Sequence, residues 1–320
     1  MKILITGGAG FLGSHLSDKY VNEGNKVICL DNFSSSDLFN IRSLLEKRNF
    51  KLINGDVRNF ELVDKLMRDV DVVVHLAAQI HVDKSFINPR ETYDTNVFGT
   101  LNILEAARIN DPKKILLAST SEVYGSAKYS PMDENHPLEA SHPYGASKIA
   151  ADRMALAYNH TYDLGVDIIR CFNFFGPRQK DSGYGGAISI FTKRILNNQP
   201  PIIYGDGSQT RDYTYVKDVV KAYDLVINDN KKYNDRVINF GTGVEVSILN
   251  LAKKLIKIIG KDMEPAFVAP RPGEVQRLIC NYNKAKELYN FAPAYDIDKG
   301  LNEYVNWYKN HKSEEWVKPG

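Results

Sequence analysis

The sequence predicts an α/β fold, a doubly wound parallel sheet followed by a smaller mixed α/β region. Three features of the 320 residues support this prediction. Short apolar segments alternate with helix-periodic segments over residues 1–172, a glycine-rich turn follows the first apolar segment, and loops rich in Gly, Pro and Asn dominate the remainder. Apolar strands that alternate with helices are typical of a parallel sheet covered on both faces.

The expected strands are short apolar runs at residues 2–6, 26–31, 51–55, 70–76, 114–118 and 166–171. The segments between them have helical periodicity at residues 11–23, 37–47, 60–68, 90–109 and 144–162. Because two parallel strands must be joined by a crossover of a dozen or more residues, these helices are expected to cover the sheet.

Beyond residue 172 the pattern becomes less regular. The loops FFGPRQKDSGYGG, NNQPPIIYGDGSQ and APRPGE separate shorter elements, such as a strand at residues 237–240. We therefore expect a first domain of residues 1–172, to which part of 212–245 returns, and a second domain of residues 173–211 and 246–320. A ligand is expected in the cleft between them, where the strands end.

The composition argues against several classes of partner. With 41 basic and 39 acidic residues, the net charge of +2 gives no reason to expect nucleic acid or an anionic membrane surface. No apolar run approaches the roughly 18 to 20 residues that span a bilayer, and the chain begins directly with a strand, so a cytoplasmic protein is expected. Cys29, Cys171 and Cys280 are far apart in the sequence, so no metal site is expected.

A glycine fingerprint follows the first strand. Gly7, Gly10 and Gly13 have the spacing G-x-x-G-x-x-G and open the first helix. Glycine lets the backbone turn tightly and approach a pyrophosphate, which then lies at the positive end of the helix dipole. Asp31 ends the second strand, where a carboxylate accepts hydrogen bonds from ribose hydroxyls and repels a 2′-phosphate. The sequence therefore favours NAD over NADP.

Two later strand ends extend the expected cofactor site. Asp56 follows the third strand, where it is placed either for the adenine amine or for a turn. The segment LAAQ at residues 76–79 ends the fourth strand with small residues, as expected where backbone passes close to a dinucleotide.

Tyr144 and Lys148 are four residues apart in HPYGASK, after the segment STSE at residues 119–122. On a helix this spacing places both side chains on one face, one turn apart. A neighbouring ammonium favours the phenolate and is expected to lower the pKa of the phenol. Such a phenol can accept the proton of a sugar hydroxyl while hydride leaves for a nicotinamide. An exposed helix face is the alternative for an isolated Y-x-x-x-K pair.

Ordered blocks along nearly the whole chain resemble a known family. They are TGGAGFLG, GDV, HLAAQ, TNVFGT, STSEVYG, PYGASK, FNFFGPRQ, GDGSQTRDYTYV and RPGEVQR, together with Asp31. They are similar to those of extended short-chain dehydrogenases/reductases, in the branch of NAD-dependent sugar-nucleotide epimerases and dehydratases. The resemblance implies a Rossmann domain that binds NAD, a nucleotide-sugar substrate with UDP favoured, and a homodimer.

The resemblance also implies roles for individual residues. Tyr144 would be the base, Lys148 would orient the nicotinamide ribose, and Thr120 would hydrogen-bond the sugar 4-hydroxyl. Residues implied to contact NAD are Gly7, Gly10, Phe11, Leu12, Gly13, Asp31, Asn32, Asp56, Val57, Leu76, Ala77, Ala78, Asn96, Ser119, Tyr144 and Lys148. Residues implied to contact the substrate are His81, Asn173, Arg178, Gln179, Tyr204, Arg211, Arg271 and Glu274. Guanidinium groups suit a diphosphate because they bind its oxygens in pairs.

Glu122 bears on which reaction follows oxidation at carbon 4. Similar 4-epimerases usually have a small or apolar residue there, whereas a carboxylate can remove the carbon 5 proton and donate a proton at carbon 6. The HVDKS segment at residues 81–85 also looks like that of dTDP-glucose 4,6-dehydratases. A UDP-sugar 4,6-dehydratase, with UDP-N-acetylglucosamine as an example substrate, is therefore expected, and Ser121 and Glu122 join the catalytic set.

Ser121 leaves other reactions open. The dTDP-glucose dehydratases have Asp-Glu after the threonine, whereas the Ser-Glu pair resembles GDP-mannose and retaining UDP-N-acetylglucosamine 4,6-dehydratases and UDP-glucuronate decarboxylases. A 4-epimerase, a decarboxylase and a 5,6-dehydratase are the alternatives. A protein that only senses NAD is a different class, and it would be expected to lack the Tyr-Lys pair and the substrate arginines.

Overall fold

The computed structural model describes residues 1–181, 185–229, 231, 236–271 and 273–311, and its centre is a seven-stranded sheet. All its neighbouring strands are parallel, in the order β11-β6-β5-β4-β1-β2-β3. The strands are β1 (Lys2–Thr6), β2 (Lys26–Asp31), β3 (Phe50–Asn54), β4 (Val72–His75), β5 (Lys114–Thr120), β6 (Val166–Cys171) and β11 (Val237–Phe240). The predicted doubly wound fold is confirmed.

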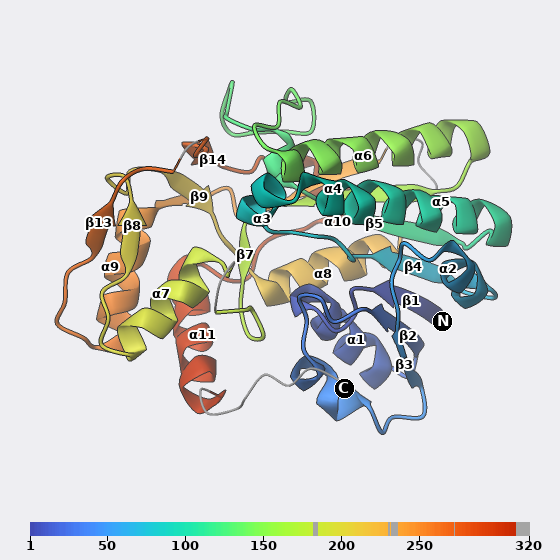
Figure 1. Cartoon of the computed structure of the whole chain (residues 1–320), viewed down its shortest axis with the longest axis horizontal. Coiled ribbons are helices and arrows are strands. Elements are labelled where there is room, and N and C mark those ends of the chain that lie inside the picture. Colours follow the sequence, from blue (N-terminus) through green and yellow to red (C-terminus); the bar gives the residue numbers. More distant parts are fainter. Residues whose placement is uncertain (182–184, 230, 232–235, 272, 312–320) are drawn as a thin grey trace.

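Helices cover both faces of this sheet (Figure 1). One face packs against α1 (Phe11–Asn22) and α8 (Val216–Ile227), and the other against α2 (Phe60–Met67), α5 (Gly99–Asn110) and α6 (Pro143–Tyr162). Side chains alternate between the two faces along each strand. In β1, Ile3 and Ile5 therefore enter one core, whereas Leu4 enters the other.

The expected helix at residues 37–47 is a shorter 3₁₀ helix, η1 (Leu38–Leu44). Its apolar residues Leu38, Ile41 and Leu44 are spaced by three, and they pack into the core beside α1. Since side chains at i and i+3 are aligned in a 3₁₀ helix, this tighter coil directs all three inward.

The expected helix at residues 90–109 has three consecutive parts. They are α4 (Pro89–Tyr93), the π-helical turn η2 (Asp94–Phe98) and α5. Within η2, the side chain of Asn96 is buried, accepts from Gln79 N at 2.7 Å and donates to Gln79 O at 2.9 Å. A wide turn at this position directs Asn96 towards the end of β4, and such turns often occur at functional sites.

The second region contains α7 (Ala187–Leu196), α9 (Ile248–Ile259) and α11 (Ile297–His311) around their own apolar core. Its small sheets pair β8 (Ile202–Tyr204) with β13 (Ala266–Val268), and β9 (Thr210–Asp212) with β12 (Glu245–Ser247) and β14 (Arg277–Leu278). Between these segments the chain returns to the first sheet through α8 and β11, and α10 (Asn283–Tyr289) packs beside β11. The proposed domain limits stay a prediction, and residues 312–320 lie outside the described part.

Two strand fragments and two short elements complete the frame of the cavity described below. β7 (Phe174–Phe175) pairs in parallel with β10 (Thr214–Tyr215). α3 (Val82–Ile87) follows β4, and the 3₁₀ turn η3 (Ser121–Val123) follows β5. In the part of the chain that the structure describes, no helix is long and apolar enough to cross a membrane.

A buried ion pair joins α6 to β6. Both Arg170 Nε and Arg170 Nη2 lie 2.9 Å from Asp152 Oδ2, and both side chains are at most 2% exposed. Arg170 Nη1 also donates to the Tyr124 hydroxyl at 3.0 Å, which in turn donates to Asn239 Oδ1 at 2.6 Å. Removing one member of such a pair leaves the other charge buried and uncompensated.

We expect Asp152→Asn to lower the free energy of unfolding by about 3 to 5 kcal/mol, the usual cost of breaking a buried pair. Denaturant titration measures this change. The control is Lys113→Ala, which removes an exposed pair with Asp71 in which the lysine is 80% exposed, and it is expected to change stability by less than about 1 kcal/mol. Equal effects of the two substitutions would contradict the prediction.

Candidate active site

A cavity of about 1020 Å³ lies where β1, β2, β4 and β5 end, between the sheet and the second region. This volume is at the upper end of the range for small-molecule sites and suits two ligands side by side. Almost all the site residues predicted from the sequence line it; Asp56 and Asn96 do not. Among the described residues, no group of three or more His, Cys, Asp or Glu side chains is placed to hold a metal ion.

The glycine turn forms one end of the cavity. Gly7 has a φ of +67°, in the left-handed region, and a Cβ on Gly13 would lie 2.1 Å from the Gly7 carbonyl oxygen. α1 begins after Gly10, where no described side chain caps the first N–H groups. Free N–H groups and the helix dipole make this end of α1 a binding site for an anion.

Asp31 joins the glycine turn to the loop after β2. Its Oδ2 accepts from Ala9 N at 3.0 Å, while Oδ1 accepts from Phe33 N at 2.9 Å and Ser36 Oγ at 2.6 Å. Burial raises the pKa of this carboxyl, although the hydrogen bonds oppose that effect. Asp31 therefore lines the cavity and also holds the glycine turn and the loop after β2 in place.

Asp56 lies outside the cavity lining, so direct contact with the adenine is not supported. Its carboxylate accepts from Asn32 Nδ2 at 2.8 Å and pairs with Arg58 at 2.7 Å. Partial burial opposes ionisation, but the hydrogen bonds from Arg58 and Asn32 lower the pKa of Asp56 to about 2. Its observed role is to hold Asn32, which does line the cavity, as does the neighbouring Val57.

Asn96 lies behind the cavity wall rather than on it. Besides the two hydrogen bonds to Gln79, its Nδ2 donates to Ser147 Oγ at 2.9 Å. It thus connects the end of β4, where Leu76, Ala77 and Ala78 line the cavity, to the first turns of α6. Asn96 thus supports this wall, and the cofactor contact expected for it stays a prediction.

Tyr144 and Lys148 lie one turn apart on α6, as the spacing predicts, and both are buried in the cavity wall. Lys148 Nζ donates to the Ala118 carbonyl oxygen of β5 at 2.9 Å. Burial lowers the pKa of Lys148 to about 8, and the Asp152 carboxylate partly opposes this shift.

The lowered phenol pKa expected for Tyr144 is wrong. Burial raises the pKa of Tyr144 well above its usual value, and hydrogen bonding with Thr120 only partly offsets this rise. The carboxylates of Glu122 and Asp152 raise it further. Desolvation outweighs the benefit expected from the nearby lysine, because a buried phenolate loses its hydration.

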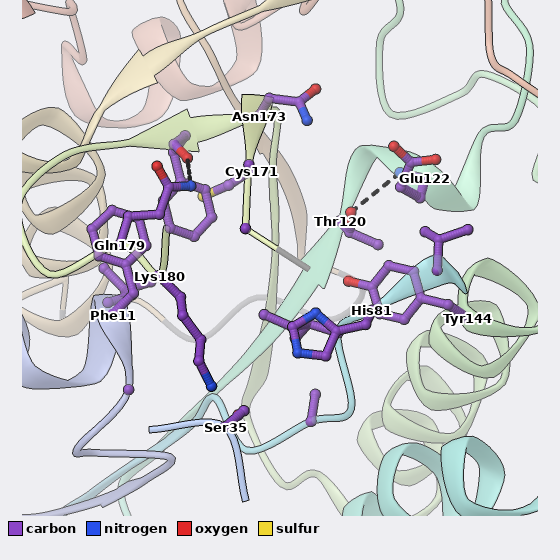
Figure 2. A pocket seen from close by; sticks show the side chains of 18 of the residues that line it. Phe11, Ser35, His81, Thr120, Glu122, Tyr144, Cys171, Asn173, Gln179 and Lys180 are labelled. Carbon is purple, nitrogen blue, oxygen red and sulfur yellow. Dashed lines mark hydrogen bonds between the residues drawn. The ribbon is translucent and has the colours of Figure 1, made fainter. Parts of the chain in front are cut away.

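Thr120, Ser121 and Glu122 occupy the turn from β5 into η3. Thr120 caps this turn, its Oγ1 accepting from Glu122 N at 3.2 Å. Figure 2 shows Thr120, Glu122, His81 and Tyr144 on one side of the cavity, and Gln179 and Lys180 on the other. The Glu122 carboxylate is 19% exposed and lies 3.2 Å from His142 Nε2, so a carboxylate faces the same space as the phenol.

The second region supplies the rest of the cavity. Asn173 lines it, and its Oδ1 is buried without a hydrogen-bond partner among the described residues, which suits a ligand hydroxyl or amide. The Arg271 guanidinium lies 4.0 Å from the centre of the Tyr204 ring, and Arg211 Nη2 donates to Glu274 at 3.1 Å. Arg271 provides positive charge here, whereas the Glu274 carboxylate offsets that of Arg211. Their contact with a diphosphate stays a prediction.

Arg178 lines the cavity, but its guanidinium is ion-paired with Asp18 of α1. His15 of the same helix lies 2.9 Å from the Pro177 carbonyl oxygen, and burial lowers the pKa of this histidine to about 4. Because a carbonyl oxygen can only accept, His15 Nε2 is the donor of this hydrogen bond. Arg178 therefore fastens the loop after β7 to α1, while its Nη1 is buried without a hydrogen-bond partner among the described residues. The substrate contact predicted for it stays a prediction.

Several lining residues were not found from the sequence. Ser34, Ser35 and Ser36 line the cavity near Asp31, and a serine run that begins three residues after Asp31 was a readable signal for them. Lys180 also lines the cavity and extends into it on the side of Ser35 (Figure 2). His142 precedes the Tyr-Lys motif, but only the fold shows that its ring reaches Glu122.

The comparisons with known proteins agree with this geometry. The family model described as GDP-mannose 4,6 dehydratase matches residues 4–304. The chain belongs to this family. It is thus an extended short-chain dehydrogenase/reductase and an NAD-dependent enzyme that acts on nucleotide sugars.

Three similar proteins show the breadth of the family. A Methanocaldococcus jannaschii protein named "Putative UDP-glucose 4-epimerase" is 42% identical over 97% of this chain and 99% of its own. The structure of Thermotoga maritima UDP-glucose 4-epimerase with UDP-glucose has a TM-score of 0.92 and 34% identity, covering 98% of this chain and 100% of that one. Streptomyces venezuelae dTDP-glucose 4,6-dehydratase, with NAD bound, has a TM-score of 0.92 and 31% identity over 98% of both chains.

The residues of this family member fit NAD. Its pyrophosphate fits the glycine turn, where Gly7 and Gly13 have no side chains, and the N-terminus of α1, whose first N–H groups are not capped by any described side chain. A ribose fits beside Asp31 and the nearby serines. Tyr144 and Lys148 line the opposite part of the same cavity.

We expect Gly13→Ala to weaken NAD binding by between about tenfold and hundredfold, because the new methyl group must displace the Gly7 backbone at an overpacking cost of roughly 1 to 3 kcal/mol. Calorimetric titration of nucleotide-stripped protein with NAD measures this. The control is Gly24→Ala, a glycine of positive φ with no heavy atom within 4 Å of the added Cβ, which is expected to lower stability but not affinity. An unchanged affinity of Gly13→Ala for NAD would contradict the prediction that the pyrophosphate binds at the glycine turn.

Proposed function

We propose that the chain is an NAD-dependent sugar-nucleotide 4,6-dehydratase that acts on a UDP-hexose such as UDP-N-acetylglucosamine. The observation that supports this most is the Glu122 carboxylate, which shares the cavity with Thr120, Tyr144 and Lys148. Oxidation at carbon 4 needs only the last three groups. A carboxylate in the same space supplies the additional base that elimination requires.

In this proposal, Tyr144 accepts the proton of the sugar 4-hydroxyl, and Thr120 hydrogen-bonds the oxygen that becomes the ketone. NAD, when bound, takes up the hydrogen of carbon 4 as hydride and later returns it. Lys148, fixed by the Ala118 carbonyl, provides positive charge beneath this end of the site. The proton acceptor is the phenolate form of Tyr144, and positive charge near it, such as that of Lys148, favours this form.

Glu122 would act next. A ketone at carbon 4 acidifies the carbon 5 proton, which the carboxylate removes. The resulting carboxylic acid then protonates the carbon 6 hydroxyl, which leaves as water. The hydride would then return to carbon 6, carbon 5 would take up a proton from solvent, and Tyr144 would release the proton of the 4-hydroxyl to solvent, which gives a 4-keto-6-deoxy sugar. One carboxyl group can act as base and then acid because its protonation state alternates between the two steps.

A 4-epimerase is the second candidate, and the comparisons favour it. The M. jannaschii relative and the T. maritima structure are both described by that activity. Position 121 is a buried serine where similar dTDP-glucose dehydratases have an acid, which argues against that type of dehydratase but does not itself favour an epimerase. In an epimerase, Glu122 would line the cavity as a polar side chain but would not transfer a proton. A UDP-glucuronate decarboxylase and a 5,6-dehydratase are further outcomes of the test below, and the expected homodimer and cytoplasmic location stay predictions.

We expect incubation with UDP-N-acetylglucosamine to give a product lighter by one water in mass spectrometry. Glu122→Gln should slow its formation by roughly 10² to 10⁴-fold, the usual contribution of a general acid–base group. The control is Glu139→Gln, a carboxylate that is 54% exposed and outside the cavity, which should leave the rate unchanged.

Other products would decide against the proposal. An isomer of unchanged mass would identify a 4-epimerase, and loss of carbon dioxide from UDP-glucuronate would identify a decarboxylase. A dehydrated product that retains an alkene would identify a 5,6-dehydratase.

A further inference from the structure

His142 uses both ring nitrogens at the junction between α6 and η3. It is the N-cap of α6, and its Nδ1 accepts from Gly145 N at 3.0 Å. Its Nε2 lies 3.2 Å from Glu122 Oε2. One imidazole thus contacts both the start of the helix that carries Tyr144 and the carboxylate proposed to act at carbon 5.

The two contacts together define the tautomer of the ring. A backbone N–H can only donate, so Nδ1 must present a lone pair, and the proton of a neutral imidazole then lies on Nε2. The Nε2–H group therefore donates to Glu122.

The surroundings of His142 restrict its orientation. The side chain is only 5% exposed. The Phe86 ring meets it edge-on at 6.3 Å, and the Tyr144 ring lies nearly parallel to it at 6.0 Å with an interplanar angle of 11°. A Cβ on Gly145 would lie 3.2 Å from His142 Cε1, so glycine leaves the space that the imidazole needs.

We infer that His142 is a positioning residue for Glu122: it directs the carboxylate into the cavity, and it couples that position to the helix of Tyr144. The inference rests on the proposed function, since it matters for catalysis only where Glu122 removes the carbon 5 proton. Glu122 Oε2 accepts the hydrogen bond from His142 Nε2–H, and Glu122 Oε1 stays available for the sugar. Because small misplacements of a reacting group are costly, the rate depends on this contact.

Two substitutions separate the contact from the cap. Asparagine is among the best N-cap residues, so His142→Asn should keep α6 intact while losing the donor to Glu122. We expect it to lower kcat for the dehydrated product roughly 100-fold, the scale of a 1 Å misplacement, with KM changed by less than about twofold. In a Glu122→Gln background the same substitution should add no further loss, because its effect passes through the carboxylate.

The matched control is His136→Asn, which removes another buried imidazole whose Nε2 accepts from Lys128 N at 2.9 Å, outside the cavity. It is expected to lower stability without changing kcat. If the losses from His142→Asn and Glu122→Gln multiply in the double variant, His142 acts independently of Glu122 and the inference is wrong. A normal kcat in His142→Asn would also overturn it.

A measurement without substrate tests the contact separately. In ¹⁵N spectra of the histidines of the NAD-bound enzyme, His142 should be the Nε2–H tautomer, and Glu122→Ala should shift its Nε2 resonance. A ring protonated on Nδ1, or one insensitive to Glu122→Ala, would overturn the inference even in an active dehydratase. If no sugar nucleotide loses water, the proposed function fails, and the spectra still decide whether His142 holds Glu122.

Discussion

The hydrogen bond from Lys148 Nζ to the Ala118 carbonyl oxygen fixes helix α6 against the end of strand β5. Every group proposed to act on the sugar belongs to one of these two elements or to the turn η3 that joins on to β5. Tyr144 precedes Lys148 by one helical turn, while Thr120 and Glu122 follow Ala118 along the chain. A shift of α6 along the sheet would therefore separate the phenol from both the threonine and the carboxylate.

This contact requires charges to be buried beneath the site, and the surrounding network compensates for them. Lys148 is buried one turn before Asp152 on α6, and Asp152 is in turn paired with Arg170 of β6. Buried charges are tolerated when they are paired and hydrogen-bonded. The same low-polarity surroundings raise the pKa of Tyr144.

The features of this fold that were readable from the sequence depend on local patterns. The parallel strands are apolar runs in the sequence. The cofactor turn needs glycine at position 13 because a Cβ there would clash with the Gly7 carbonyl oxygen. Tyr144 and Lys148 share a helix face because they are four residues apart. Features set by distant contacts were missed. Arg178 is paired with Asp18, far away in the sequence, and Asn96 turns inward through a π-helical turn towards Gln79. No local pattern encodes either partner.

The choice between dehydration and epimerisation depends on one bond, the carbon 5–hydrogen bond that Glu122 is proposed to break. The most direct measurement is to run the reaction in D₂O, reduce the product at once with borohydride to stop exchange, and locate deuterium by NMR. Proton removal by Glu122 requires solvent deuterium at carbon 5 and the original carbon 4 hydrogen at carbon 6. A product that keeps its original hydrogen at carbon 5 would contradict the role proposed for Glu122.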